Sequence, residues 1–255
     1  MSQQRHIVSG DAQLKKLSLL RLLGAATASG AAAYGAYVAA AWLRYGRPRR
    51  ASAEEADSLL DRFMPEYDVV ERRSIQINAP AEVALRAACR LDLEGSCLVR
   101  AIFKGRELLL GARSDAKPLP RGLLAKTKAL GWCPLAEVLD REIVMGAATE
   151  PWAANPVFRP LAPEDFAAFR DPGFVKIAWT LRADPVNMIK SIFRTETRVF
   201  ACDPVARAKF RKYWAFLSPG IILIRVVMLR SLKREAERRA HGVPLSSRAR
   251  LEDRV

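Results

Sequence analysis

An uncharged apolar run near the N-terminus is the feature that most constrains how this chain can fold. The stretch from residue 17 to residue 43 carries one charge, Arg21, close to its start. A helix of about 20 residues, rising 1.5 Å per residue, crosses a hydrocarbon core of about 30 Å. Trp42 and Tyr45 fall where interfacial aromatic side chains are commonly found. We therefore expect residues 17–43 to form one transmembrane helix behind a basic tail, residues 1–16.

Two alternatives stay open for this run. Its small residues VAAA offer a site at which a secretory signal peptide can be cleaved, and its Ala-rich composition also suits a buried or interfacial helix. Four Lys or Arg flank each end, so the positive-inside rule leaves the orientation undecided. Small residues four positions apart, Ala26 with Gly30 and Ala31 with Gly35, permit close helix packing. A homodimer through this helix is therefore a hypothesis.

The excess of positive charge lies at the two ends of the chain. The whole sequence has a net charge of +15. Residues 1–50 hold eight Lys and Arg against one Asp, and residues 225–255 hold nine against four acidic residues. Residues 51–224 are nearly balanced, with 25 basic and 22 acidic residues. Basic ends on a balanced domain favour anionic lipid headgroups, whereas a nucleic-acid groove needs a basic stripe on the fold itself. We expect a membrane partner and no nucleic acid.

Histidine and cysteine are scarce, which narrows the chemistry. The two histidines, His6 and His241, fall in predicted tails. Ser-His-Asp and Cys-His mechanisms need an imidazole beside the nucleophile, so no catalytic residue is predicted. The four cysteines contain no CxxC pair and are expected to be small core residues. We predict no metal site and no cofactor.

Residues 44–65 are predicted to be a linker with a short amphipathic helix. Ser52 and Glu55 have the spacing of a capping box, and apolar residues follow every three to four positions before Pro65. A folded domain is then predicted over residues 66–240.

Within this domain, β-branched strands and amphipathic helices follow one another. Pro80 suits the first position of a helix that directly follows a strand. Asp203 and Pro204 form an N-cap and N1 pair for a long C-terminal helix, in which Pro219 is expected to cause a kink or a break. The predicted strands are residues 68–78, 132–139, 142–149, 174–181 and 192–202, the shorter helices are residues 96–111, 121–130 and 163–169, and residues 241–255 form a tail.

This order of elements carries a family resemblance. The segment INAPAEV, where a strand passes into a helix, and the segment TETRVFACDPVARAKFRKYW, where the last strand passes into the terminal helix, resemble the opening and closing segments of the START/polyketide-cyclase-like (SRPBCC) superfamily. The chain resembles a membrane-anchored, bacterial-type member. The resemblance implies an α+β helix-grip fold, in which an antiparallel sheet wraps the C-terminal helix. It also implies a cavity for a lipid, isoprenoid, polyketide or other apolar molecule.

Alternation along the strands then predicts which side chains line that cavity. In a strand, successive side chains point to opposite faces. The expected lining residues are Val175, Ile177, Trp179, Leu181, Phe193, Thr195, Thr197, Phe210, Tyr213, Trp214 and Leu217. Trp152, in the loop EPWAANP, is a candidate lid. The same stripes also fit a filled core.

The opposite face of the last strand is predicted to be solvated. Arg194, Glu196 and Arg198 alternate in charge along it, as exposed positions often do. We expect a membrane-anchored module that binds or transfers an apolar molecule. Two alternatives remain: a cyclase- or hydrolase-like enzyme, which would need inward-facing acids, and a structural protein with a filled core.

Overall fold

The chain divides into two compact units, Met1–Arg44 and Tyr45–Val255. The structure, a computed structural model, describes residues 29–92, 96–111 and 119–242. In the first unit, residues 29–44 form a helix, and a side chain at Gly30 or Gly35 would meet open space. The remainder of the predicted transmembrane segment and both predicted tails, apart from the last helical residues before position 243, lie outside the described residues.

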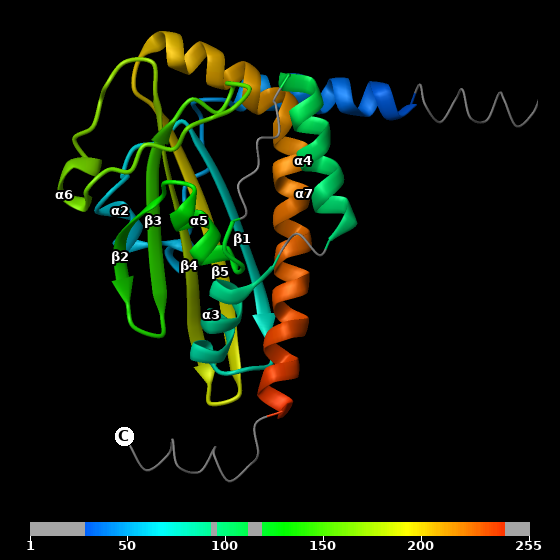
Figure 1. Ribbon diagram of the computed structural model, residues 1–255, viewed down its shortest axis with the longest axis vertical. Helices are drawn as coiled ribbons and strands as arrows, with labels where there is room; N and C mark the ends of the chain where they lie inside the picture. The colour runs from blue at the N-terminus through cyan, green and yellow to red at the C-terminus, as the bar shows by residue number, and fades with distance from the viewer. Residues whose placement is uncertain (1–28, 93–95, 112–118, 243–255) are drawn as a thin grey trace, which may run out of the picture. The chain divides into compact units, whose positions relative to one another are not determined.

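The second unit is built on a five-stranded antiparallel sheet. Its strand order is β1-β5-β4-β3-β2. The strands are β1 (Val69–Ile77), β2 (Cys133–Val138), β3 (Glu142–Thr149), β4 (Val175–Asn187) and β5 (Lys190–Ala201). The helices are η1 (Ala53–Glu55), α2 (Ser58–Asp61), α3 (Ala81–Arg90), α4 (Cys97–Leu110), α5 (Leu123–Ala129), α6 (Pro163–Phe166) and α7 (Pro204–Gly242). Figure 1 shows α7 running beside the sheet next to β1. The predicted α+β helix-grip class is confirmed.

The long C-terminal helix starts where the sequence predicts. Asp203 caps it, because its side-chain Oδ1 accepts from the backbone N–H groups of Val205, at 2.7 Å, and Ala206, at 3.0 Å. The helix is assigned without a break through Pro219. Figure 1 nevertheless shows it changing direction along its length. A proline inside a helix removes one backbone donor and bends the helix, so the predicted kink occurs and the predicted break does not.

One face of the sheet, here called the inner face, packs against α3 and α7 in two separate clusters. The first lies near the ends of β1 and β4 and contains Ile77, Leu181 and Phe193, together with α3 and the second half of α7. The second lies at the opposite ends of the strands, where Val175 and Val199 pack against Phe210 of α7. The core under α7 is therefore divided along the strands.

The opposite face, here called the outer face, is also covered. Leu60, Phe63 and Met64 are buried on it and pack with Val144 and Phe166. The stretch predicted as a linker thus contributes to the core from Tyr45 onward. Its predicted helix is split into η1 and α2, because Ala56 adopts an extended conformation and Asp57 starts a new helix by accepting from the N–H of Leu60 at 2.9 Å.

The covered outer face corrects the prediction for β5. Glu196 and Arg198 are 5% and 2% exposed, so the expectation of a solvated face was wrong for both residues. Arg194 is half-buried and pairs with Asp184 at 2.8 Å. The cysteine prediction also needs correction, since Cys97 is exposed and the other three are half-buried.

Candidate ligand-binding face of the sheet

The inner face presents one row of side chains across the middle of the sheet. Glu71 of β1 lies opposite Thr197 of β5, Thr197 lies opposite Trp179 of β4, and Trp179 lies opposite Met145 of β3. Partners in an antiparallel register point to the same face. This row lies between the two buried clusters and is here called the middle band, together with its neighbours Ile75 and Ile177.

The middle band is less buried than the sheet above and below it except at Met145, which is fully buried. Ile75, Ile177 and Trp179 are only half-buried, although all three are apolar and lie within strands. In a fully packed core such side chains interdigitate with little free space. The inner face therefore has two packed ends and an incompletely covered centre.

The predicted lining residues divide into a fully buried group and a half-buried group. All seven that lie on β4 and β5 belong to the alternating set that faces α3 and α7. Those fully buried are Val175, Leu181, Phe193, Thr195 and Phe210. Those half-buried are Ile177, Trp179, Thr197, Tyr213, Trp214 and Leu217. The second group contains the predicted residues that keep some exposure to solvent.

Aromatic side chains border the middle band on the side of β2. The Trp132 ring meets the edge of Trp179 at a centroid distance of 6.0 Å and lies 5.0 Å from the ring of Phe158. Aromatic surfaces of this kind commonly line pockets for apolar ligands.

The lid candidate, Trp152, packs on the cluster around Phe210. It is half-buried, and the ammonium group of Lys209 lies 5.7 Å from its ring centroid. Its loop is held by Arg106 of α4, whose Nη2 donates to the carbonyls of Pro151 at 3.1 Å and Ala153 at 3.4 Å. Trp152 thus lies at one end of the inner face.

Sequence analysis missed the charged residue that reaches this face. The side chain of Arg225 extends from α7 to the sheet, where Nη1 donates to the carbonyl of Glu71 at 3.0 Å and Nη2 donates to Oγ1 of Thr197 at 2.5 Å. It is the sole charged residue in the run from Tyr213 to Leu229. The signal in the sequence was a lone arginine inside an apolar helical run. Burying an unpaired charge costs free energy, so such a residue indicates a partner or a ligand.

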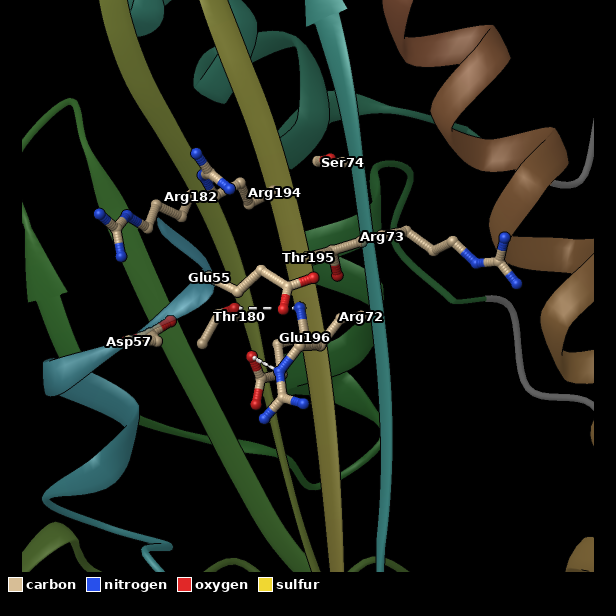
Figure 2. A pocket seen from close by; sticks show the side chains of 10 residues that line it. All are labelled: Glu55, Asp57, Arg72, Arg73, Ser74, Thr180, Arg182, Arg194, Thr195 and Glu196. Carbon is tan, nitrogen blue, oxygen red and sulfur yellow. Dashed lines mark hydrogen bonds and ion pairs between the residues drawn. The ribbon is translucent and has the colours of Figure 1, made fainter. Parts of the chain in front are cut away.

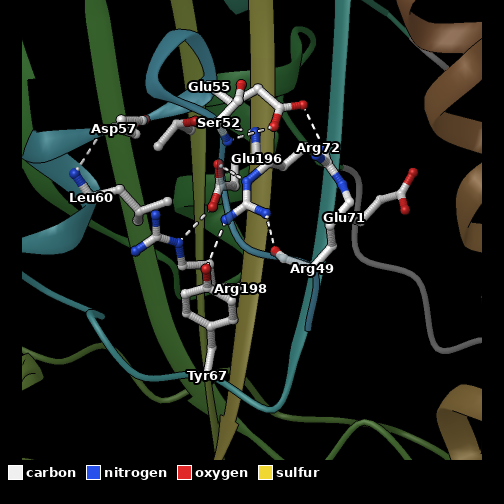
Figure 3. A network of polar contacts seen from close by, with 12 residues as sticks. Arg49, Ser52, Glu55, Asp57, Leu60, Tyr67, Glu71, Arg72, Glu196 and Arg198 are labelled. Atoms are coloured by element: carbon white, nitrogen blue, oxygen red, sulfur yellow. Dashed lines mark hydrogen bonds and ion pairs between the residues drawn. The ribbon is translucent and has the colours of Figure 1, made fainter. Parts of the chain in front are cut away.

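The outer face carries a dense network of ion pairs (Figure 3). Glu196 accepts from Nε of Arg72 at 2.8 Å and from Nε of Arg198 at 2.6 Å. Arg72 also donates to the Tyr67 hydroxyl, and Arg198 also pairs with Asp61 at 2.6 Å. Each buried charge therefore has a partner of opposite charge, and the network joins the segment before β1 to the sheet.

The pocket beside this network is small. Figure 2 shows its lining of arginine, acidic and hydroxyl side chains, among them Arg182, Glu196 and Thr180. Its volume is about 70 Å³, well below the roughly 300–1,000 Å³ of pockets for drug-sized ligands. The pocket does not suit an apolar molecule.

A larger depression lies where α3 ends beside the last turns of α7. Its volume is about 520 Å³, and it is lined mainly by charged side chains, including Arg90, Arg234 and Glu235. Two of its arginines, Arg238 and Arg239, already pair with Glu235. Such a lining does not favour an apolar ligand either. Among the residues that the structure describes, no cluster of three His, Cys, Asp or Glu side chains could hold a metal ion.

Comparisons with known proteins give distant structural likenesses. No protein-family model matches the sequence, and no curated protein matches it. Similar solved structures include a hypothetical protein of Helicobacter pylori, 7% identical with a TM-score of 0.37 over 73% of this chain and 99% of that one. They also include the self-sacrificing resistance protein CalC from Micromonospora echinospora, 9% identical with a TM-score of 0.33 over 70% of this chain and 100% of that one. The Zhui aromatase/cyclase from Streptomyces sp. R1128 is 15% identical, with a TM-score of 0.27 over 69% of this chain and 98% of that one. At these TM-scores the likenesses assign no activity and no ligand to this chain.

Proposed function

We propose that this protein is a membrane-anchored module that binds or transfers an apolar small molecule, such as a lipid or an isoprenoid. The molecule would lie on the middle band of the inner face, beneath α7. The observation that carries this proposal is the half-burial of Ile75, Ile177 and Trp179 between two fully buried clusters.

A ligand on the middle band would complete the burial that the protein leaves unfinished. Removing apolar surface from water is worth roughly 25 cal/mol per Å², so half-exposed Trp and Ile side chains favour an apolar partner. The few polar groups nearby, the hydroxyls of Thr197 and Tyr213, suit the orientation of a largely apolar ligand. This combination supports binding better than it supports a filled structural core.

The surface of α4 supports a location next to a membrane. Four large apolar side chains are exposed on this helix: Leu98, Phe103, Leu108 and Leu109, with exposed fractions of 41–75%. Clustered exposed apolar residues commonly mark contact with a membrane or a partner. Because α4 also holds the Trp152 loop through Arg106, it lies close to one end of the proposed site.

The anchor in this proposal is the N-terminal segment, residues 17–43. Within the described part of the chain, α7 is the helix that is long and apolar enough to cross a membrane. However, Met228, Leu229 and Leu232 of α7 are buried against the sheet and α3. A core helix passes the same test of length and composition, so we propose the N-terminal segment as the anchor instead.

Ligand binding can be tested by the stability of the full-length protein in detergent. A molecule that binds only the native state raises the free energy of unfolding by about 2.7 kcal/mol at a concentration 100 times its Kd. We expect a lipid or an isoprenoid from a panel of neutral and anionic compounds to raise the denaturation midpoint. The Ile177→Trp substitution should remove that rise, because the larger ring fills the middle band. Val186→Trp, at a 54% exposed position of the same strand, is the matched control. If no compound raises the midpoint, a structural role is favoured.

The anchor can be tested by deletion. Tyr45 packs against Phe210 in the second unit, so the cut belongs after Arg44. We expect the protein without residues 1–44 to leave the membrane fraction in low salt. Release that requires high salt would show a second, electrostatic attachment. Retention even in high salt would contradict the single anchor.

A further inference from the structure

The inner face contains a half-buried positive charge, Arg225 of α7, that makes no ion pair within the described residues. Arg225 makes two hydrogen bonds, to the Glu71 carbonyl and to the Thr197 hydroxyl, and both acceptors are neutral. Among the described residues, no carboxylate lies within ion-pair distance of its guanidinium. This differs from Arg198 of β5, which is fully buried and pairs with two carboxylates.

The two nearest acidic side chains are already engaged. The carboxylate of Glu71 pairs with Nε of Arg73 at 2.7 Å. The carboxylate of Glu196 points to the opposite face, where Arg72 and Arg198 hold it. Neither can turn to Arg225 without breaking a pair it already makes.

Arg225 lies among apolar residues, where an unpaired charge costs free energy. Its neighbours on α7 are Ile224 and Val226, and it donates to Thr197, which lies opposite Trp179 on the middle band. Burial lowers the pKa of the Arg225 guanidinium to about 10, although the side chain still carries its charge at neutral pH. A charge that is partly removed from water and lacks a counter-charge is destabilising, so this position favours an anionic partner.

We propose that the ligand of the middle band is an anionic amphiphile, whose carboxylate or phosphate head pairs with Arg225 while its apolar chain lies along Trp179 and Ile177. A guanidinium has five N–H donors in a planar fork. Two of its nitrogens make the bonds to Glu71 and Thr197, which orient the fork and leave further N–H donors for the head. Bidentate pairing with carboxylate or phosphate is the geometry for which arginine is suited. This inference rests on the proposed function and adds the chemical class of the ligand.

The wild-type protein alone gives the first test. Full-length protein in phosphatidylcholine nanodiscs is titrated with cis-parinarate, whose fluorescence is excited by energy transfer from tryptophan, and empty nanodiscs give the background. Oleate, oleyl phosphate and oleyl alcohol then compete for the site. We expect oleate or oleyl phosphate to compete at least ten times more strongly than oleyl alcohol. The preferred anion distinguishes a fatty-acid head from a phosphate head.

Substitutions at Arg225 test whether this residue causes the preference for an anionic head. Arg225→Gln should weaken cis-parinarate binding, abolish the tenfold preference and change the Kd of oleyl alcohol, corrected for the weaker probe, less than twofold. Arg225→Lys should restore part of the preference, because it keeps the charge and loses the fork. Arg230→Gln, at an exposed position of the same helix, is the matched control and should behave as wild type.

The possible failures are distinguishable. Equal competition by oleate, oleyl phosphate and oleyl alcohol in wild type would overturn the anionic class and leave the proposed function standing. A preference that survives in Arg225→Gln would overturn Arg225 as the head-group site. If cis-parinarate, itself a carboxylate, does not bind the wild-type protein above the nanodisc background, this inference fails, and the stability panel then decides the proposed function. None of the wild-type outcomes depends on whether a variant folds.

Discussion

The Glu196 network of the outer face and Arg225 of the inner face differ in how their charges are matched. The outer face is not matched throughout, since Lys176 is 2% exposed there and donates only to the carbonyls of Phe166 and Ala167. On the outer face, Glu196 is held between Arg72 and Arg198, so the charges are matched within the protein. On the inner face, Arg225 bonds only to neutral oxygens and the apolar band around it is half-buried. A matched network fastens one part of a chain to another, whereas an unmatched charge beside an accessible apolar surface leaves room for a ligand. The comparison assigns a structural role to the Glu196 network and supports the proposed ligand site on the inner face.

The largest effect is expected from breaking the outer network. Glu196→Gln would leave two buried guanidinium groups with one carboxylate fewer, and removing one partner of a buried ion pair costs about 3–5 kcal/mol. Chemical denaturation of the full-length protein measures this loss. The control is Asp171→Asn, which breaks the exposed pair with Arg159 and should cost less than about 1 kcal/mol. Equal losses for the two variants would show that the outer network is no more structural than a surface pair.

A graded effect is expected inside the inner face, where burial changes along α7. Phe210 is 2% exposed, so Phe210→Ala should cost about 3–5 kcal/mol. Trp214 is only half-buried, and Trp214→Ala should cost about 2 kcal/mol, since less of its surface is removed from water. Denaturation of both variants checks the difference. If Trp214→Ala costs as much as Phe210→Ala, that part of the inner face is fully packed in solution.

A third effect is a dependence on pH that belongs to the outer face. Glu142 is 5% exposed and lies near Asp57, Arg182 and Asp184. Burial, reinforced by the hydrogen bond and the negative charge of Asp57, raises the pKa of the Glu142 carboxyl from 4.5 to about 8. Between these two values the native state holds a proton that the unfolded chain has released. Stability should therefore be highest below pH 4.5, as far as this group is concerned, and should fall as the pH rises to about 8.

A neutral side chain at this position tests that assignment. Glu142→Gln should flatten the decline in stability over the same pH range, as thermal denaturation at a series of pH values would show. Glu137→Gln, at an exposed position of neighbouring β2, should leave the decline unchanged. A wild-type protein whose stability is flat across this range would place the Glu142 carboxyl in contact with water.

The helices and strands were largely predictable, because the spacing of apolar residues and the capping residues of a helix depend only on neighbouring positions in the sequence. β3 begins and ends at the predicted residues, and α7 begins at the predicted cap. β4 extends to Asn187, beyond its predicted end, because Pro185 is accommodated at a shift in register with β5. The alternation along β4 and β5 also places side chains on the inner face as expected.

What covers each face was not predictable, because it depends on contacts between distant segments. Glu196 and Arg198 look like a solvated pair in a strand, and they become buried because Met64 and its neighbours pack on them. Arg225 is the opposite case, because its charge is visible in the sequence. A lone charge within an apolar run indicates either a partner inside the protein or a ligand.

The most direct test of the inner face as a binding site is native mass spectrometry of the full-length protein released gently from membranes. The account predicts one apolar molecule bound per chain in the wild type and in Val186→Trp. It predicts that this molecule is absent from Ile177→Trp when that variant retains the wild-type circular dichroism spectrum. A wild-type protein that carries no such molecule, or an Ile177→Trp variant that carries it equally well, would contradict the assignment of the middle band as the ligand site.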